Sequence, residues 1–237
     1  MSGELSTPLT LWFSDVGRDA RPLVGGKVAS LGELLRAGCR VPTGFAVTSA
    51  AYRRFIEATG LDRLIRDTIG GLNADDVAAV DAASQKIQQA FLNSPVPAEL
   101  ADPIRAEYGR LAETLGDPAP AVAVRSSAVA EDTEAASFAG QHDTYLWVQG
   151  ADEVLDAVLR CWASAFTPRA IAYRAHQQIG LEDAAVAVGV QQMVDPRAAG
   201  VMFTLSPRSG DPSLVVVEGS WGPGVAVVGG EDRKSVV

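Results

Sequence analysis

The sequence predicts an α+β fold in which a layer of helices covers antiparallel strands. Two long stretches, residues 75–92 and 98–115, repeat apolar residues at helical spacing and are joined by a segment that contains two prolines. After residue 185, three short β-prone runs are separated by Asp, Pro and Gly turns, which is typical of an antiparallel meander. Between these regions, the apolar run Ala121–Val124 predicts one more strand, which delivers Arg125 to a loop.

The composition excludes some classes of binding partner. The chain has 237 residues, of which 47% are hydrophobic, and 20 Lys and Arg against 29 Asp and Glu give a net charge of −9. This charge repels nucleic acid and anionic membranes, so we expect neither as a partner. No run approaches the roughly 20 apolar residues of a membrane span, and Met1–Pro22 lacks the apolar core of a signal peptide. Cys39 and Cys161 are predicted to be reduced, buried thiols, and the location to be cytoplasmic.

The first elements follow from glycines and capping residues. An amphipathic helix is predicted to open at Gly25 and to close near Gly38, because apolar residues recur between them at helical spacing. The alternating run Val41–Val47 predicts a short strand. Thr48 or Ser49 can then cap a helix that ends at residue 60.

The remaining elements alternate between helices and strands. A strand is predicted at about residues 143–148, followed by a helix whose buried stripe recurs every four residues. Thr167 and Pro168 start another helix that runs toward Gly180. Strands are then predicted at residues 185–194, 201–205 and 214–221. If the strands up to Trp221 have no later partners, the sheet keeps an open, aggregation-prone edge.

Arg125 is the first candidate for a ligand-binding residue. It stands at a strand end, and Ala139 and Gly140 in the following Ser/Ala/Gly-rich segment leave backbone N–H groups unshielded. A guanidinium offers planar, bidentate donors that match phosphate oxygens, so this loop can hold a polyphosphate. The alternative is a surface arginine paired with Glu131 or Asp132.

Lys27 is the second candidate. It follows two glycines at a helix start, but residue 21 is Arg and residue 28 is Val, so the P-loop pattern of nucleotide hydrolases is not met. A cation at a helix N-terminus opposes the helix dipole unless it meets an anion there. The alternative is a solvated lysine.

Gln191 ends a strand face made of small residues, Ala187 and Gly189. Such a face can accept a flat base and hydrogen-bond its edge or the ribose, although a strand-end glutamine facing water fits the pattern equally well. The two histidines, His142 and His176, have no Cys, His or carboxylate at metal-ligand spacing, so no metal site is predicted.

Four blocks of the chain, taken together and in order, closely resemble one family. They are Gly25–Leu34, Val41–Thr48, Arg125–Gln141 and Gln191–Val194. The family is the ATP-binding, N-terminal domain of phosphoenolpyruvate synthase and pyruvate phosphate dikinase, which rifampicin phosphotransferase and phenylphosphate synthase share. The resemblance runs from about Val24 to Gly222.

The resemblance implies an ATP-grasp-like fold that clamps MgATP between two lobes. It also implies an ATP-dependent phosphotransferase of the pyruvate, water dikinase type, which passes a phosphoryl group to a histidine on a swivelling domain located on another segment or chain. Lys27 and Arg125 would contact the ATP phosphates and act as the catalytic residues, and Gly140 would lie along the triphosphate. Thr144 and Gln191 would complete the nucleotide pocket.

The resemblance also sets the expected lobes, with residues 1–183 as the first lobe and residues 184–237 as the start of an incomplete second lobe. Family members hold Mg²⁺ with residues on later strands, so we expect its ligands beyond residue 237 and the C-terminal lobe to be truncated. Two alternatives stay open. One is a truncated, non-catalytic nucleotide-binding or regulatory subunit, and the other is a kinase component for another acceptor, such as phenol or a rifamycin.

Overall fold

The computed structural model describes residues 7–128, 144–177, 185–225, 227 and 234–236. The chain divides into two compact units, Met1–Met193 and Val194–Val237, which are described separately. Helices and antiparallel sheets are both present, as the sequence predicts. Within the described ranges, no helix combines the length and the apolar character needed to cross a membrane.

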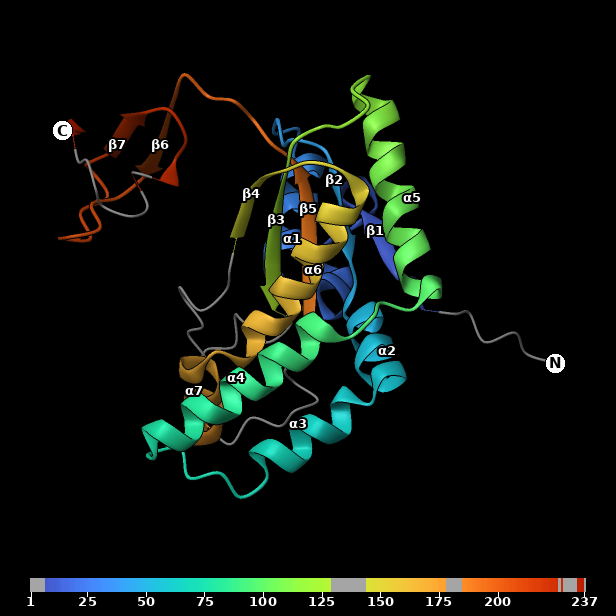
Figure 1. Cartoon of the computed structure of the whole chain (residues 1–237). Helices are drawn as coiled ribbons and strands as arrows, with labels where there is room; N and C mark the ends of the chain where they lie inside the picture. Colours follow the sequence, from blue (N-terminus) through green and yellow to red (C-terminus); the bar gives the residue numbers. More distant parts are fainter. Residues whose placement is uncertain (1–6, 129–143, 178–184, 226, 228–233, 237) are drawn as a thin grey trace. The chain divides into compact units, whose positions relative to one another are not determined.

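The described part of the first unit is built around a five-stranded antiparallel sheet with the order β1-β2-β5-β3-β4 (Figure 1). Its strands are β1 (Thr10–Trp12), β2 (Gly44–Val47), β3 (Val122–Ala128), β4 (Thr144–Val148) and β5 (Val186–Gln192). β5 inserts between β2 and β3, although it is the last of these five strands along the chain. The predicted meander is therefore wrong for β5, because this buried strand pairs with earlier strands and not with the strand that follows it.

The position of β5 also determines where the two units divide. Because β5 belongs to the first sheet, the compact units separate between Met193 and Val194, ten residues later than the predicted lobe boundary at residue 183. The assignment of the units to the lobes of an ATP-grasp fold stays a prediction.

The helices of the first unit follow the predicted order, with one addition. They are α1 (Arg21–Arg36), α2 (Ser49–Thr59), α3 (Leu61–Ile69), α4 (Val77–Asn93), α5 (Ala98–Leu115), α6 (Ala151–Ala163) and α7 (Pro168–Gln177). Thr48 caps α2 by accepting a hydrogen bond from the backbone N–H of Ala51, which settles the choice between Thr48 and Ser49. α3 begins directly after Gly60, the C-cap of α2, and was not predicted.

The sheet carries a hydrophobic cluster on each face. On one face, the alternate residues Val122 and Val124 of β3 and Val188 and Val190 of β5 pack with Trp162 of α6. On the other face, α1 closes a smaller cluster made of Phe13, Val16, Val24, Val28, Ala29 and Ala46. Figure 1 shows α6 and α1 on opposite sides of the sheet. The site described below lies on the α1 side.

The second unit contains a three-stranded antiparallel sheet with the order β6-β7-β8. Its strands are β6 (Ala198–Phe203), β7 (Val216–Trp221) and β8 (Lys234–Val236). β8 pairs with β7, so the strands up to Trp221 do have a later partner within this unit. Large apolar side chains nevertheless remain exposed on this unit, including Met202 at 65% and Trp221 at 71%.

The two cysteines differ in their surroundings. Neither forms a disulfide, and Cys161 is buried in α6, as predicted. Cys39 is exposed, so the prediction of a buried thiol is wrong at this position. It follows the end of α1, in a run of exposed residues from Arg36 to Arg40. Cys161 has the apolar helical context from which burial was inferred, whereas Cys39 lies past the last buried turn of α1.

Glu107 fastens the edge strand β1 to α5, and we expect its replacement to lower stability. Its carboxylate accepts a 2.6 Å hydrogen bond from Nε1 of Trp12, which is only 8% exposed. Glu107→Ala leaves this indole N–H unpaired, so the free energy of unfolding should fall by about 1–3 kcal/mol. Urea denaturation measures the loss. Glu113→Ala, an exposed position on the same helix, should stay within about 0.5 kcal/mol of wild type, and equal effects of the two substitutions would contradict this account.

Candidate functional site

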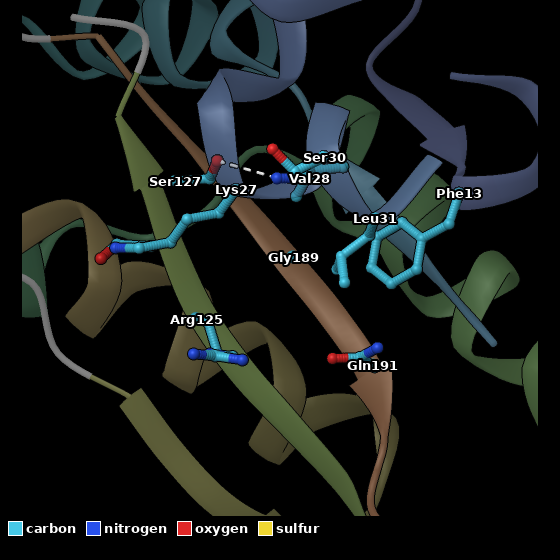
Figure 2. Close-up of a pocket in the computed structure, with 10 residues that line it drawn as sticks. Phe13, Lys27, Val28, Ser30, Leu31, Arg125, Ser127, Gly189 and Gln191 are labelled. Carbon is cyan, nitrogen blue, oxygen red and sulfur yellow. Dashed lines mark hydrogen bonds between the residues drawn. The ribbon is translucent and has the colours of Figure 1, made fainter. Parts of the chain in front are cut away.

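A cavity of about 310 Å³ lies in the first unit, between α1 and the sheet (Figure 2). α1 supplies one wall, and β3 and β5 form the floor. The lining residues are Phe13, Lys27, Val28, Ser30, Leu31, Arg125, Ser126, Ser127, Gly189 and Gln191. The structure thus brings together three of the five predicted site residues, Lys27, Arg125 and Gln191.

α1 breaks at Gly25, two residues before Lys27. Gly25 has φ 74° and ψ 171°, a combination that is essentially restricted to glycine. A Cβ atom at this position would collide with the backbone carbonyl of Ser127, so α1 and β3 approach as closely as they do only because residue 25 is glycine. The helix resumes at Gly26, and the backbone N–H of Val28 donates to Oγ of Ser127 at 3.4 Å.

Lys27 and Arg125 give the cavity its charge. Arg125 is the one exposed residue of β3, whose other residues are all buried. Figure 2 shows the side chains of Lys27, from α1, and Arg125 both extending over β3. Among the described residues that line the cavity, Lys27 and Arg125 are basic and none is Asp or Glu. The proposed alternative partners of Arg125, Glu131 and Asp132, lie outside the described residues.

β5 supplies the floor and one polar group. Gly189 pairs with Arg125 across the β5–β3 ladder. A Cβ atom at residue 189 would meet Val28 at 3.1 Å, so the absence of a side chain leaves space between β5 and α1. Gln191 lies two residues further along the same face and is partly buried. Its Nε2 donates to the backbone carbonyl of Pro42 at 3.1 Å. Gln191 therefore lines the cavity and is not a fully solvated strand-end residue.

The apolar wall was only partly foreseen from the sequence. Val28 and Leu31 belong to the predicted apolar stripe of α1, and the structure places them on the cavity lining. Phe13, from a 3₁₀ helix at Phe13–Asp15, was missed. No local pattern points to Phe13, because it lines the cavity together with Gly189 only once β5 has inserted into the sheet.

Of the other two predicted site residues, Thr144 is not among the residues that line this cavity. Thr144 pairs with Arg125 across the β3–β4 ladder, which places both side chains on the same face of the sheet. It lines a separate hollow of about 520 Å³ together with Tyr145 and Arg160, whose guanidinium lies 4.8 Å from the tyrosine ring centroid. Gly140 lies outside the described residues.

The chemistry of the cavity suits an anionic ligand with an apolar portion. Ammonium and guanidinium groups only donate hydrogen bonds, and a guanidinium matches the geometry of phosphate oxygens. Phe13, Val28 and Leu31 offer an apolar wall beside these donors. Within the ranges that the structure describes, no group of three or more His, Cys, Asp or Glu residues could hold a metal ion. His176 lies on α7, with Nε2 3.8 Å from a carboxylate oxygen of Asp75.

Comparison with known proteins identifies relatives over nearly the whole chain. Residues 21–235 match the family described as "Pyruvate phosphate dikinase, AMP/ATP-binding domain". A probable phosphoenolpyruvate synthase of Staphylothermus marinus is 50% identical over 223 residues, which are 93% of this chain. Phosphoenolpyruvate synthases of Aeropyrum pernix and Escherichia coli are 44% and 41% identical over 94% and 97% of this chain.

The relatives are much longer than this chain. The matched region covers 27% of the Staphylothermus marinus protein, 27% of the Aeropyrum pernix protein and 30% of the Escherichia coli protein. The similarity therefore concerns one portion of each relative, and within that portion it includes the segments that carry Lys27, Arg125 and Gln191.

Proposed function

This chain belongs to the family of pyruvate phosphate dikinase AMP/ATP-binding domains, and from this membership we propose that it binds MgATP in the cavity between α1 and the sheet. In this proposal the domain works in a phosphotransferase like the phosphoenolpyruvate synthases that it resembles. It passes a phosphoryl group from ATP to a histidine on a separate swivelling domain.

One observation carries the proposal: two cations from segments about a hundred residues apart in sequence line the same cavity. Lys27 comes from the resumed part of α1, and Arg125 comes from the middle of β3. A polyphosphate would explain why two cations from distant segments line the same cavity. We propose that Lys27 and Arg125 bind the phosphates of ATP, and that Gly140 and Thr144 lie along the nucleotide, as the family resemblance implies.

The role of the two cations follows from the charge of the reaction. When the phosphoryl group leaves the nucleotide and bonds to a histidine ring nitrogen, charge is spread over its peripheral oxygens and over the leaving oxygen. Lys27 and Arg125 would offset this charge and hold the phosphate in line, so catalysis is by positioning and electrostatic stabilisation. The nucleophile is the histidine of the separate domain.

Magnesium is expected as the companion of ATP. Among the residues that the structure describes, no group of three candidate ligand side chains lies close enough together to hold a metal ion. Mg²⁺ would neutralise phosphate charge when bound together with ATP.

MgATP should stabilise this chain against unfolding. A ligand that binds only the folded state adds about 2.7 kcal/mol at a concentration one hundred times its Kd. Differential scanning fluorimetry at rising MgATP concentration measures the increase in Tm, with MgCl₂ alone and inorganic phosphate as controls. A Tm that stays constant up to millimolar MgATP, in protein shown to be folded by circular dichroism, would contradict the proposal.

A labelling experiment separates a phosphotransferase from a binding module. With radiolabelled ATP and a separately expressed phosphohistidine domain from a phosphoenolpyruvate synthase, label should appear on the histidine only when this chain is present. The Arg125→Met variant should abolish the transfer. Nucleotide binding without any transfer would favour a non-catalytic nucleotide-binding subunit.

A further inference from the structure

The helical turn that carries Lys27 has no capping side chain of its own. Gly25 interrupts α1, so the residues that follow it form a new first turn. The backbone N–H groups of a first turn have no acceptor within their own helix. A Ser, Thr, Asp or Asn just before the turn commonly supplies an acceptor through its side chain, but this position is occupied by glycine.

Ser127 of β3 supplies the acceptor that Gly25 lacks. Its Oγ accepts a hydrogen bond from the backbone N–H of Val28 at 3.4 Å, which is the dashed line in Figure 2. Val28 is the third residue of the resumed helix, where the side chain of a local N-cap residue would bind. Ser127 and Val28 are both buried, so water does not compete for this bond. A strand residue 99 positions away in sequence therefore caps the helix.

Glycine at position 25 makes this cap possible. A Cβ atom on residue 25 would collide with both the carbonyl oxygen and the Oγ of Ser127. Any other residue at this position would hold β3 too far from the helix for Ser127 to reach Val28. The residue that removes the local cap is thus the same one that admits the cap from β3.

The bond from Val28 to Ser127 links the two elements that carry the cations. Ser127 lies two residues after Arg125 on β3, so the two side chains lie on the same face of the sheet. Val28 directly follows Lys27 in α1. By holding Val28, Ser127 fixes the backbone of Lys27 relative to Arg125, and both cations line the cavity.

Resting on the proposed nucleotide function, we infer that Ser127 is a positioning residue that acts through Lys27. Its hydroxyl holds Lys27 where this ammonium and the Arg125 guanidinium meet the same triphosphate. Electrostatic stabilisation depends on donors that are already in place, and a misplacement of about 1 Å can be costly. Removal of the hydroxyl should therefore weaken the contribution of Lys27 to phosphate binding.

A double-mutant cycle tests this inference. Isothermal titration calorimetry gives the Kd of MgATP for wild type, Ser127→Ala, Lys27→Met and the double variant. Ser127→Ala should weaken MgATP binding by about five- to tenfold in the presence of Lys27 and by less than about twofold in Lys27→Met, because the group that it positions is gone. Adenosine, which has no phosphate, should bind wild type and Ser127→Ala equally. A general distortion of the fold would instead weaken both ligands and would not depend on Lys27.

Thr48→Val is the matched control. The Thr48 hydroxyl also caps a helix through a 3.4 Å bond, from the backbone N–H of Ala51, but α2 contributes no residue to the cavity lining. Its loss should lower stability and leave the Kd of MgATP unchanged. Urea denaturation establishes that each variant is folded under the conditions of the titration. If Ser127→Ala does not fold, Ser127→Cys, which keeps a weak acceptor, takes its place and should show the same dependence on Lys27.

Three results would overturn the inference. They are wild-type affinity for MgATP in Ser127→Ala, an equal loss of affinity with and without Lys27, and weaker binding of adenosine to Ser127→Ala. All three leave MgATP binding by the wild type intact and so spare the proposed function. Failure of the wild type to bind MgATP would remove the proposed function and this inference with it.

Discussion

Replacing Arg125 by methionine should weaken the binding of MgATP by roughly 10- to 100-fold, because charge-assisted hydrogen bonds to phosphate contribute about 1.5–3 kcal/mol. Methionine keeps much of the aliphatic length and removes the guanidinium. Arg125 is the exposed residue of β3, so its loss should change the free energy of unfolding very little. Titration calorimetry measures the affinity, and urea denaturation measures the stability.

Two further variants serve as controls for the Arg125 experiment. Arg125→Lys keeps the charge but loses the planar fork, so its affinity should lie between those of wild type and Arg125→Met. Arg63→Met removes an arginine of α3 that is 84% exposed and paired only with Asp67 among the described residues, and it should bind MgATP as wild type does. If Arg125→Met kept wild-type affinity, Arg125 would not be a phosphate ligand.

Gly25→Ala should lower the free energy of unfolding by about 3 kcal/mol, combining the strain of a glycine-only backbone conformation with an overpacked contact. The new Cβ atom would collide with the carbonyl of Ser127, which belongs to the backbone of a buried part of β3 and cannot move aside cheaply. If α1 shifts to relieve the collision, Lys27 shifts with it, so the affinity for MgATP should fall as well. Thermal and urea denaturation measure the first effect, and calorimetry measures the second.

Gly38→Ala separates the two causes of this loss. Gly38 has φ 80°, but a Cβ atom there would meet nothing within 4 Å. This variant therefore carries backbone strain without a collision and should lose about 1 kcal/mol, with unchanged affinity for MgATP. Equal losses in Gly25→Ala and Gly38→Ala would show that the close approach of α1 and β3 contributes nothing.

Local patterns predicted most of the elements because each depends on nearby residues. The stripe of α6, the cap at Thr48 and the strand that carries Arg125 are encoded within about a dozen residues each, and all three are present. The alternation in β5 also placed Gly189 and Gln191 on one face, and both line the cavity. Lys27 and Arg125 could be named from their residue types and their positions at a helix start and on a strand.

What the sequence did not reveal depends on contacts between distant segments. The sequence of a buried strand such as β5 does not indicate which strands it pairs with. Its pairing with β2 and β3 therefore differs from the predicted meander. For the same reason Phe13 could not be assigned to the cavity, and the hydrogen bond from Gln191 to Pro42 spans 149 positions. The break in α1 at Gly25 requires a glycine and the close approach of β3. The sequence shows the glycine but not the approach of β3.

The most direct test of the account is a crystal structure of this chain with Mg²⁺ and a non-hydrolysable ATP analogue. The account predicts that phosphate oxygens lie within about 3 Å of both Nζ of Lys27 and the guanidinium of Arg125, in the cavity between α1 and the sheet. A triphosphate bound elsewhere, with neither cation in contact with it, would contradict the account.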